Sequence, residues 1–403
     1  MWIDSQSVGV NGRWRRLASS LSASNGPSPA AAARRCSGRD AVPAQAMKIF
    51  RQEQAAEQRR LVRALLKAAL LLILFTGPAS AQVAPARSSA SNDLGTPPTP
   101  MMFEDSQTQA ARDAAARSSA LDADFAREFI HATATVNGVR LHYVSGGDGP
   151  VVVLLHGFTE TWFGFRHLLP LLTDAGYSVI APDLRGLGDS ERPLAGYDKR
   201  TLAEDVRALA HQLGHKRVLL VGTDEGGQVA YAWAARYPAE VERLVFFEAG
   251  LPGISKQEQV PWHDAFQSVA DLPEALVAGR ERVYLEWFYR NLTHDPASIA
   301  REAVDEYVRT YSKPGAMRAG FSLYRAKPQN VLDVRELAKR KLPMPVLALG
   351  GASASGSVPL DTMRAVAMNA RGGIVPRAGH YLAEERPAFL AEQILAFFKE
   401  SAK

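Results

Sequence analysis

Short apolar runs typical of β-strands alternate with amphipathic helical stretches from about residue 126 onward. Several runs are apolar on both faces, as expected for parallel strands buried on both sides of a sheet. This alternation predicts an α/β protein with a mostly parallel, doubly wound sheet. The predicted strands are 139–145, 151–156, 178–183, 217–222, 243–248, 345–351 and 372–378, and the predicted helices are 162–174, 199–213, 225–237 and 386–399.

One long interval, between Glu248 and Pro345, interrupts the alternation and contains no convincing strand. Its helical patterns lie at 272–292, 298–311 and 315–326. An insertion of this size at the carboxyl ends of parallel strands is expected to form a lid over the ligand crevice. We therefore predict one α/β domain over residues 126–403, with a helical cap at about 252–340.

Residues 47–81 contain the three parts of a secretory signal peptide. A basic stretch follows Met47, the apolar run AALLLILF comes next, and Ala79-Ser80-Ala81 forms an A-x-A cleavage site. The apolar run is much shorter than the roughly 20 residues that span a bilayer. We predict cleavage near Gln82, export to the periplasm or the exterior, and no stable membrane insertion afterwards. An uncleaved N-terminal anchor is the alternative.

Two further segments flank this signal. A signal sequence should lead the chain, so residues 1–46 are interpreted as an upstream, untranslated segment. Residues 82–125 are rich in Pro, Ser and Ala over much of their length and are predicted to be a flexible lead-in.

The net charge of +5 arises in this N-terminal part. The chain has 47 Lys+Arg and 42 Asp+Glu, of which the first 81 residues hold 12 and 4, leaving 35 and 38 and a net charge of about −3. A near-neutral mature protein gives no reason to expect a nucleic-acid partner. Cys36, the only cysteine, also precedes the cleavage site, so the mature protein is predicted to lack a disulfide, a thiolate nucleophile and a Cys-ligated metal.

The stretch LVGTDEGGQVAY places a carboxylate between a strand and a helix. Asp224 is flanked by Gly222 and Gly226 in the pattern G-x-Nu-x-G, in which glycines allow strand and helix to pack closely around a strained turn. The helix N-terminus favours the ionised form of such a carboxylate. We predict that Asp224 is a nucleophile; without partners it would equally be a polar loop residue.

Two partners for Asp224 follow in the chain. His380 comes just after the last predicted strand, in PRAGHYLAEERP, and is the predicted base. The loop after strand 345–351 has no carboxylate, whereas Glu248 ends the strand after the nucleophile turn. A Glu closing an apolar strand is costly without a partner such as an imidazole N–H. We predict that Glu248 orients His380, although a surface histidine and a solvated strand end are the alternatives.

The segment LLHGFTETW follows another buried strand. The backbone N–H groups of Phe158 and Glu225 are predicted to form an oxyanion hole. His156 in this segment is interpreted as structural, because His380 already fills the role of the base.

These motifs resemble the α/β-hydrolase superfamily over about residues 130–400, on the basis of HGF…W, PDLRGLGDSERP, GTDEGG, PGAMRAGF and AGHYLAEERP. Within it the chain resembles the epoxide hydrolase and haloalkane/haloacid dehalogenase group, and most closely the secreted bacterial epoxide hydrolases. The resemblance implies an α/β-hydrolase fold and attack by Asp224 on a saturated carbon. A carboxylate forms a stable alkyl ester there, whereas attack on an acyl carbon would give an anhydride.

The leaving group separates the two activities of this group. The resemblance implies that Tyr324 and His263, both in the lid, donate hydrogen bonds to an epoxide oxygen. A packed tyrosine and a surface histidine are the alternatives. Dehalogenases commonly have Trp or Arg after the nucleophile, and the charge of Glu225 at this position would repel a halide. Epoxide hydrolases usually have Trp or a smaller apolar residue there, so Glu225 also departs from their pattern.

The leading hypothesis is an exported epoxide hydrolase that acts on an apolar small molecule and produces a vicinal diol. The alternatives are a haloalkane or haloacid dehalogenase, another hydrolase with an Asp nucleophile, and a non-enzymatic binding protein on the same fold. Side chains and water serve each step, so no metal or organic cofactor is expected. A homodimer is possible.

Overall fold

The computed structural model describes residues 125, 127–255 and 261–400. The predicted segments 1–46, 47–81 and 82–125 therefore lie outside the described residues, apart from Phe125. Within the described ranges, no helix combines the length and the apolar character needed to cross a membrane.

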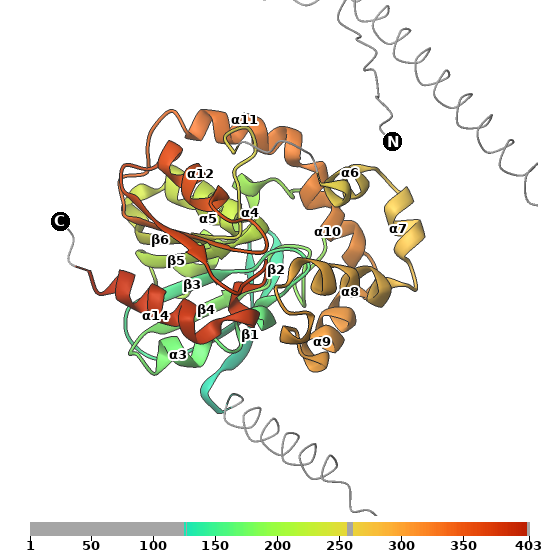
Figure 1. Ribbon diagram of the computed structural model, residues 1–403, viewed down its shortest axis with the longest axis horizontal. Coiled ribbons are helices and arrows are strands. Elements are labelled where there is room, and N and C mark those ends of the chain that lie inside the picture. Colours follow the sequence, from blue (N-terminus) through green and yellow to red (C-terminus); the bar gives the residue numbers. More distant parts are fainter. Residues whose placement is uncertain (1–124, 126, 256–260, 401–403) are drawn as a thin grey trace, which may run out of the picture. The chain divides into compact units, whose positions relative to one another are not determined.

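An eight-stranded sheet forms the centre of the domain, in the order β1-β2-β4-β3-β5-β6-β7-β8 (Figure 1). β1 and β2, and β2 and β4, pair antiparallel, and all other neighbours pair parallel, which confirms the predicted fold class. The strands are β1 (Ile130–Val136), β2 (Val139–Gly146), β3 (Val151–Leu155), β4 (Ser178–Pro182), β5 (Val218–Thr223), β6 (Val241–Phe247), β7 (Val346–Gly351) and β8 (Ala370–Val375).

The central parallel strands β3, β5 and β7 are buried on both faces, whereas the edge strand β8 is mostly exposed. Along β3, Val151, Val153 and Leu155 belong to one apolar cluster, whereas Val152 and Leu154 belong to another. The first cluster includes residues of α4 (Lys199–Gln212), α5 (Asp224–Arg236) and α12 (Val358–Val366), and the second includes residues of α3 (Leu169–Thr173) and α14 (Pro387–Phe398). Helices thus cover both faces of the sheet, as Figure 1 shows.

Some predicted elements have different bounds in the structure. Strand β1 was not predicted, because only Ala134 and Val136 of its sequence IHATATV are buried and only β2 pairs with it. Predicted helix 162–174 is a short 3₁₀ helix, Trp162–Phe165, followed by α3, whose first turn contains Pro170. A proline at that position lacks the N–H that would continue the preceding helix.

Helices occupy the interval between β6 and β7. They are α6 (Trp262–Ser268), α7 (Leu272–Val277), α8 (Glu281–Leu292), α9 (Arg301–Tyr311), α10 (Ala316–Arg325) and α11 (Lys327–Leu337). The stretch 272–292, predicted as one helical pattern, divides into α7 and α8 near Gly279, whose φ of 74° is left-handed. In Figure 1 α6 to α10 form the cap beside the sheet, and α11 returns to contact α4 and α5.

Candidate active site

The turn between β5 and α5 presents Asp224 at the carboxyl edge of the sheet. Asp224 has a φ of 48°, a left-handed conformation that non-glycine residues rarely adopt. A Cβ at Gly226 would lie 2.2 Å from the carbonyl oxygen of Leu155, and one at Gly157 would lie 2.4 Å from Cβ of Asp224. Both glycines are therefore required for this close approach of the two loops.

One carboxylate oxygen of Asp224 occupies the predicted oxyanion hole. The backbone N–H of Phe158 donates to Oδ1 over 3.0 Å, and the backbone N–H of Glu225 also donates to the carboxylate. The two predicted donors thus converge on the Asp224 side chain, although they come from loops after different strands.

His380 and Glu248 complete the predicted group. Nε2 of His380 lies 3.6 Å from Oδ2 of Asp224, and Nδ1 of His380 lies 3.0 Å from Oε2 of Glu248. This places the imidazole between the two carboxylates. His380 is therefore not a surface histidine.

The Glu248 carboxylate is buried, and residues at the end of the neighbouring strand β7 and in the loop after it donate hydrogen bonds to it. Its φ is 49°, its side chain has no exposed surface, and its Oε1 accepts hydrogen bonds from the N–H of Gly351 and the hydroxyl of Ser355 over 2.7 Å. Glu248 is thus not a solvated strand end. The loop after β7, which lacks a carboxylate of its own, supplies donors to Glu248 instead.

The electrostatics of the group favour an ion pair at rest. Burial raises the pKa of Asp224 to about 6, against the opposing effect of His380. Burial disfavours the charged form of His380, but the hydrogen bond to Glu248 and the charges of Asp224 and Glu248 outweigh it and raise its pKa to about 9. At neutral pH Asp224 is therefore mostly ionised and His380 is mostly protonated.

Two cap residues lie within electrostatic range of this group. Burial and the negative charge of Asp224 raise the pKa of Tyr324 on α10 well above its usual value, and its ring packs edge-on against Phe158. Burial lowers the pKa of His263 at the start of α6, and the charge of His380 lowers it further. Tyr324 is buried and His263 is half-buried, its side chain one-fifth exposed, so His263 is not a fully exposed surface histidine.

The Glu225 side chain has a partner that sequence reasoning missed. Its carboxylate is buried and forms an ion pair with the ammonium of Lys199, the first residue of α4. The backbone N–H of Lys199 in turn donates to Oδ1 of Asn330 on α11. The Glu225 charge that we expected to repel a halide is therefore balanced by a buried cation. Charge repulsion by Glu225 is then no longer a reason to disfavour a halide substrate.

A buried acidic cluster beside the catalytic group was also missed. Burial, and then repulsion by Glu384, raise the pKa of Glu160 to about 8; the charge of Asp224 adds to this shift, whereas that of His380 opposes it. Glu384 accepts hydrogen bonds from Arg166 and from the hydroxyl of Tyr307. Glu160 belongs to the loop after β3 and Glu384 to α13 (Leu382–Glu385), and nothing in either motif indicated that they meet.

His156 is structural, as predicted. Its Nδ1 lies 2.8 Å from the carbonyl oxygen of Gly157, and its Nε2 accepts the N–H of Leu184 over 3.1 Å. The ring is fully buried, and burial lowers its pKa. These contacts join the loops after β3 and β4, so His156 supports the oxyanion-hole loop.

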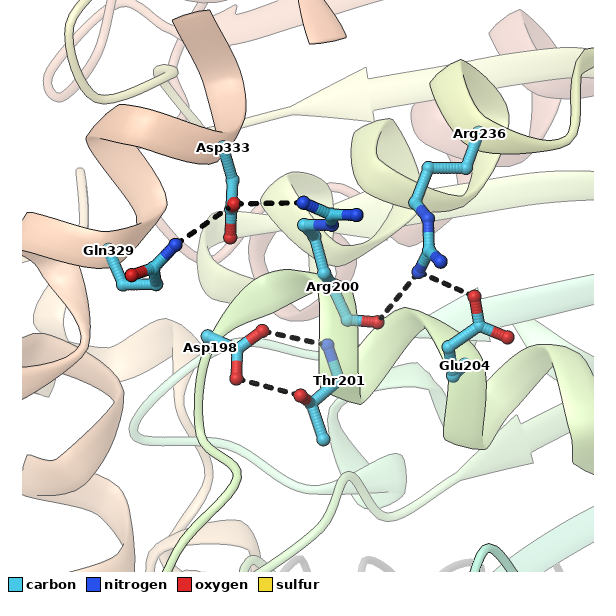
Figure 2. A pocket seen from close by; sticks show the side chains of 7 residues that line it. All are labelled: Asp198, Arg200, Thr201, Glu204, Arg236, Gln329 and Asp333. Carbon is cyan, nitrogen blue, oxygen red and sulfur yellow. Dashed lines mark hydrogen bonds and ion pairs between the residues drawn. The ribbon is translucent and has the colours of Figure 1, made fainter. Parts of the chain in front are cut away.

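A separate pocket of about 550 Å³ lies between α4, α5 and α11 (Figure 2). Four of its charged groups form pairs, Arg200 with Asp333 and Arg236 with Glu204, and Asp198 accepts hydrogen bonds from Thr201. Its lining residues are Asp198, Arg200, Thr201, Glu204, Arg236, Gln329 and Asp333. None of the predicted site residues lines it. Across the described residues, no group of three or more His, Cys, Asp or Glu side chains is arranged to hold a metal ion.

Comparison with known proteins agrees with this geometry. A family model described as the alpha/beta hydrolase fold matches residues 150–387. The soluble epoxide hydrolase of Corynebacterium sp. (strain C12) is 38% identical over 284 residues, covering 67% of this chain and 98% of that protein.

Two solved structures are similar to this chain in both sequence and fold. Cfl2 from Burkholderia cenocepacia shares 41% identity with a TM-score of 0.65, covering 68% of this chain and 96% of the other. A putative epoxide hydrolase from Pseudomonas aeruginosa shares 28% identity with a TM-score of 0.62, covering 67% and 95%. The chain therefore belongs to the α/β-hydrolase family. Within that family it falls in the epoxide hydrolase group, and it is an epoxide hydrolase-like hydrolase.

Proposed function

We propose that the protein opens an epoxide through an alkyl ester on Asp224 and hydrolyses that ester to a vicinal diol. The observation that carries this proposal is that the two carboxylate oxygens of Asp224 have different partners. Oδ1 accepts the N–H of Phe158, whereas Oδ2 faces Nε2 of His380. Oδ2 is the oxygen free to attack carbon, and Oδ1 is already placed to become the ester carbonyl.

In the first step, Oδ2 bonds to an epoxide carbon while the carbon–oxygen bond of the ring breaks. The electron pair of that bond goes to the epoxide oxygen, which takes a proton from Tyr324, with His263 as the second hydrogen-bond donor. The proton that His380 carries at rest then replaces the one that Tyr324 gives up. The step leaves a neutral ester and a neutral imidazole.

In the second step, Nε2 of His380 removes a proton from water, and the hydroxide bonds to Cγ of Asp224. Charge develops on Oδ1, where the N–H groups of Phe158 and Glu225 stabilise it. The Cγ–Oδ2 bond then breaks, and Oδ2 leaves with the product and takes the proton from His380. The carboxyl group left on Asp224 passes the remaining water proton to His380, which restores the resting ion pair. One water oxygen remains in the Asp224 carboxylate, and Glu248 holds the imidazole throughout.

The test is to follow the Asp224 ester directly. His380→Gln should still form an adduct with an epoxide, visible by intact mass, and should fail to hydrolyse it. Asp224→Asn is the matched control and should give no adduct. A single turnover of wild type in heavy-oxygen water should label Asp224, and label found only in the diol would overturn the nucleophile assignment.

A panel of epoxides, haloacids and p-nitrophenyl esters identifies the leaving group, and faster halide release than ring opening would favour a dehalogenase.

We also propose that the protein is exported. The basic, apolar and A-x-A parts of residues 47–81 support this. N-terminal sequencing of the protein from the producing cell should find a start near Gln82. A chain that keeps residues 60–81 would be anchored instead, and one that begins before Met47 would refute the interpretation of residues 1–46.

A further inference from the structure

The backbone on both sides of His380 is fixed by one carboxylate. Glu385 ends α13, and its oxygens accept the N–H of Gly379 over 3.0 and 2.9 Å and the N–H of Tyr381 over 3.1 Å. The two residues that flank the predicted base thus donate to the same side chain. Glu385 itself is no part of the Asp224–His380–Glu248 group.

The same carboxylate reaches the cap. The N–H of His294, just after α8, donates to Oε2 of Glu385 over 2.7 Å, and the N–H of His380 donates to the carbonyl oxygen of Leu292 over 2.7 Å. The contact is backbone to backbone, because a Cβ at Gly379 would lie 2.3 Å from the oxygen of Leu292. The end of α8 therefore lies directly against the loop of the base.

The His294 side chain extends this contact to the loop that holds Glu248. Its Nδ1 lies 2.8 Å from Oγ of Ser353, and the N–H of Ser353 donates to the carbonyl oxygen of Ala378. Ser353 belongs to the loop after β7 that supplies Gly351 and Ser355 to Glu248. One short cap segment, residues 292–294, thus contacts both loops that position the base.

We propose that Glu385 is a positioning residue that ties His380 to the end of α8 and keeps the base in place during ester hydrolysis. This inference rests on the proposed function. The resting imidazolium is attracted to the Asp224 carboxylate, and ester formation removes that charge. From then on His380 is positioned by Glu248 and by its backbone anchors, so the contribution of Glu385 falls mainly on the second step.

The test uses Glu385→Gln, which keeps the shape of the side chain but replaces one acceptor oxygen with an NH2 group. This group is a donor and cannot accept the backbone N–H hydrogen bonds. Glu392→Gln, on an exposed position of α14, is the matched control. Amide hydrogen exchange of the resting proteins, without any substrate, should be faster at Gly379, Tyr381 and His294 in Glu385→Gln only. Exchange equal to wild type at these amides would overturn the anchoring.

The kinetic experiment measures the two steps separately with an epoxide. Adduct hydrolysis in Glu385→Gln should slow by about tenfold to a hundredfold, the range for losing hydrogen bonds to a charged group, so the alkyl-enzyme accumulates. Adduct formation should change by about twofold at most on the same scale. Equal slowing of both steps would indicate general loosening and overturn the positioning role.

Glu385→Asp keeps the charge but withdraws it by one methylene, and it should show the same split with a smaller factor. It serves if Glu385→Gln does not fold, and an even effect on both steps would count against the proposal. If wild type opens no epoxide, the proposed function fails. The exchange experiment still decides whether Glu385 anchors the loop.

Discussion

Oδ2 of Asp224 and Nε2 of His380 are 3.6 Å apart, within ion-pair distance and beyond the length of a good hydrogen bond. Each group therefore shifts the titration of the other, and the pH dependence of adduct formation should report this. Asp224 attacks only when ionised, and its pKa is about 6. Adduct formation should decline as the pH falls through about 6. His380→Gln removes the charge that lowers the pKa of Asp224, so in that variant the decline should begin at higher pH. Rapid-mixing measurements of adduct formation between pH 5 and 8 test this, and an unmoved or lowered midpoint would contradict the assigned coupling.

Glu248→Gln should affect the second step far more than the first. The change removes the charge and the oriented hydrogen bond that raise the pKa of His380, and it disturbs the imidazole tautomer. By analogy with an Asp-to-Asn change in a catalytic triad, adduct hydrolysis should slow by about a thousandfold or more. The alkyl-enzyme should then accumulate in intact-mass spectra. Normal hydrolysis in this variant would mean that another group orients His380.

Tyr324→Phe should slow adduct formation by about a hundredfold or more, by analogy with the removal of an oxyanion-hole donor. The reason is that ring opening places charge on the epoxide oxygen, and Tyr324 is one of its two proposed donors. Hydrolysis of an adduct already formed should be nearly unchanged. Tyr143→Phe on β2 is the control, because Tyr143 is equally buried, with 8% of its surface exposed in both cases. His263→Phe should act in the same direction, and wild-type ring opening in both cap variants would refute their role.

Glu160→Gln should stabilise the protein increasingly as the pH rises. The pKa of Glu160 is raised from 4.5 to about 8 in the folded protein, so between these values the folded state holds a proton that the unfolded chain has lost. Stability therefore falls with rising pH in this window for wild type, and the neutral glutamine removes that contribution. The difference in unfolding free energy between variant and wild type should grow by about 2 kcal/mol from pH 5 to pH 7. Denaturant unfolding at both pH values measures it, with the exposed Glu392→Gln as control. A difference independent of pH would contradict the raised pKa.

Lys199→Met should destabilise the fold by about 3–5 kcal/mol, because it leaves the buried Glu225 carboxylate without its counter-charge. The double variant Lys199→Met/Glu225→Leu should recover most of this loss, since two apolar side chains can replace a buried pair. The control is Arg364→Met, which breaks an exposed pair with Asp361 and should cost less than about 1 kcal/mol. Unfolding curves in urea give all three values. Failure of the double variant to recover would mean that Lys199 has a further role in the site.

The sequence predicted the parts of the site that lie at strand ends. Asp224, Glu248 and His380 each follow a strand of the parallel sheet, and parallel strands bring their carboxyl ends to one edge. The Glu160–Glu384 proximity could not be predicted in this way, because the loop after β3 and helix α13 are brought together by tertiary contacts, among them those of Arg166 and Tyr307 with Glu384. The fold class was likewise predictable from the alternation of apolar runs. Strand β1 was not, since only two of its residues, Ala134 and Val136, are buried, and their apolar alternation is too short to give a clear pattern.

The position of the cap between β6 and β7 has a consequence for how the chain folds. These two strands are neighbours in the sheet, yet 98 residues, from Glu248 to Pro345, separate them in the sequence. Such a non-local pairing has a high contact order and forms slowly, because the whole intervening loop must close first. During synthesis β6 emerges long before β7, so its apolar edge around Val245 and Phe247 waits unpaired while the cap is made. That edge is the part of the nascent chain most exposed to pairing with another chain, and a cap that folds slowly prolongs the exposure.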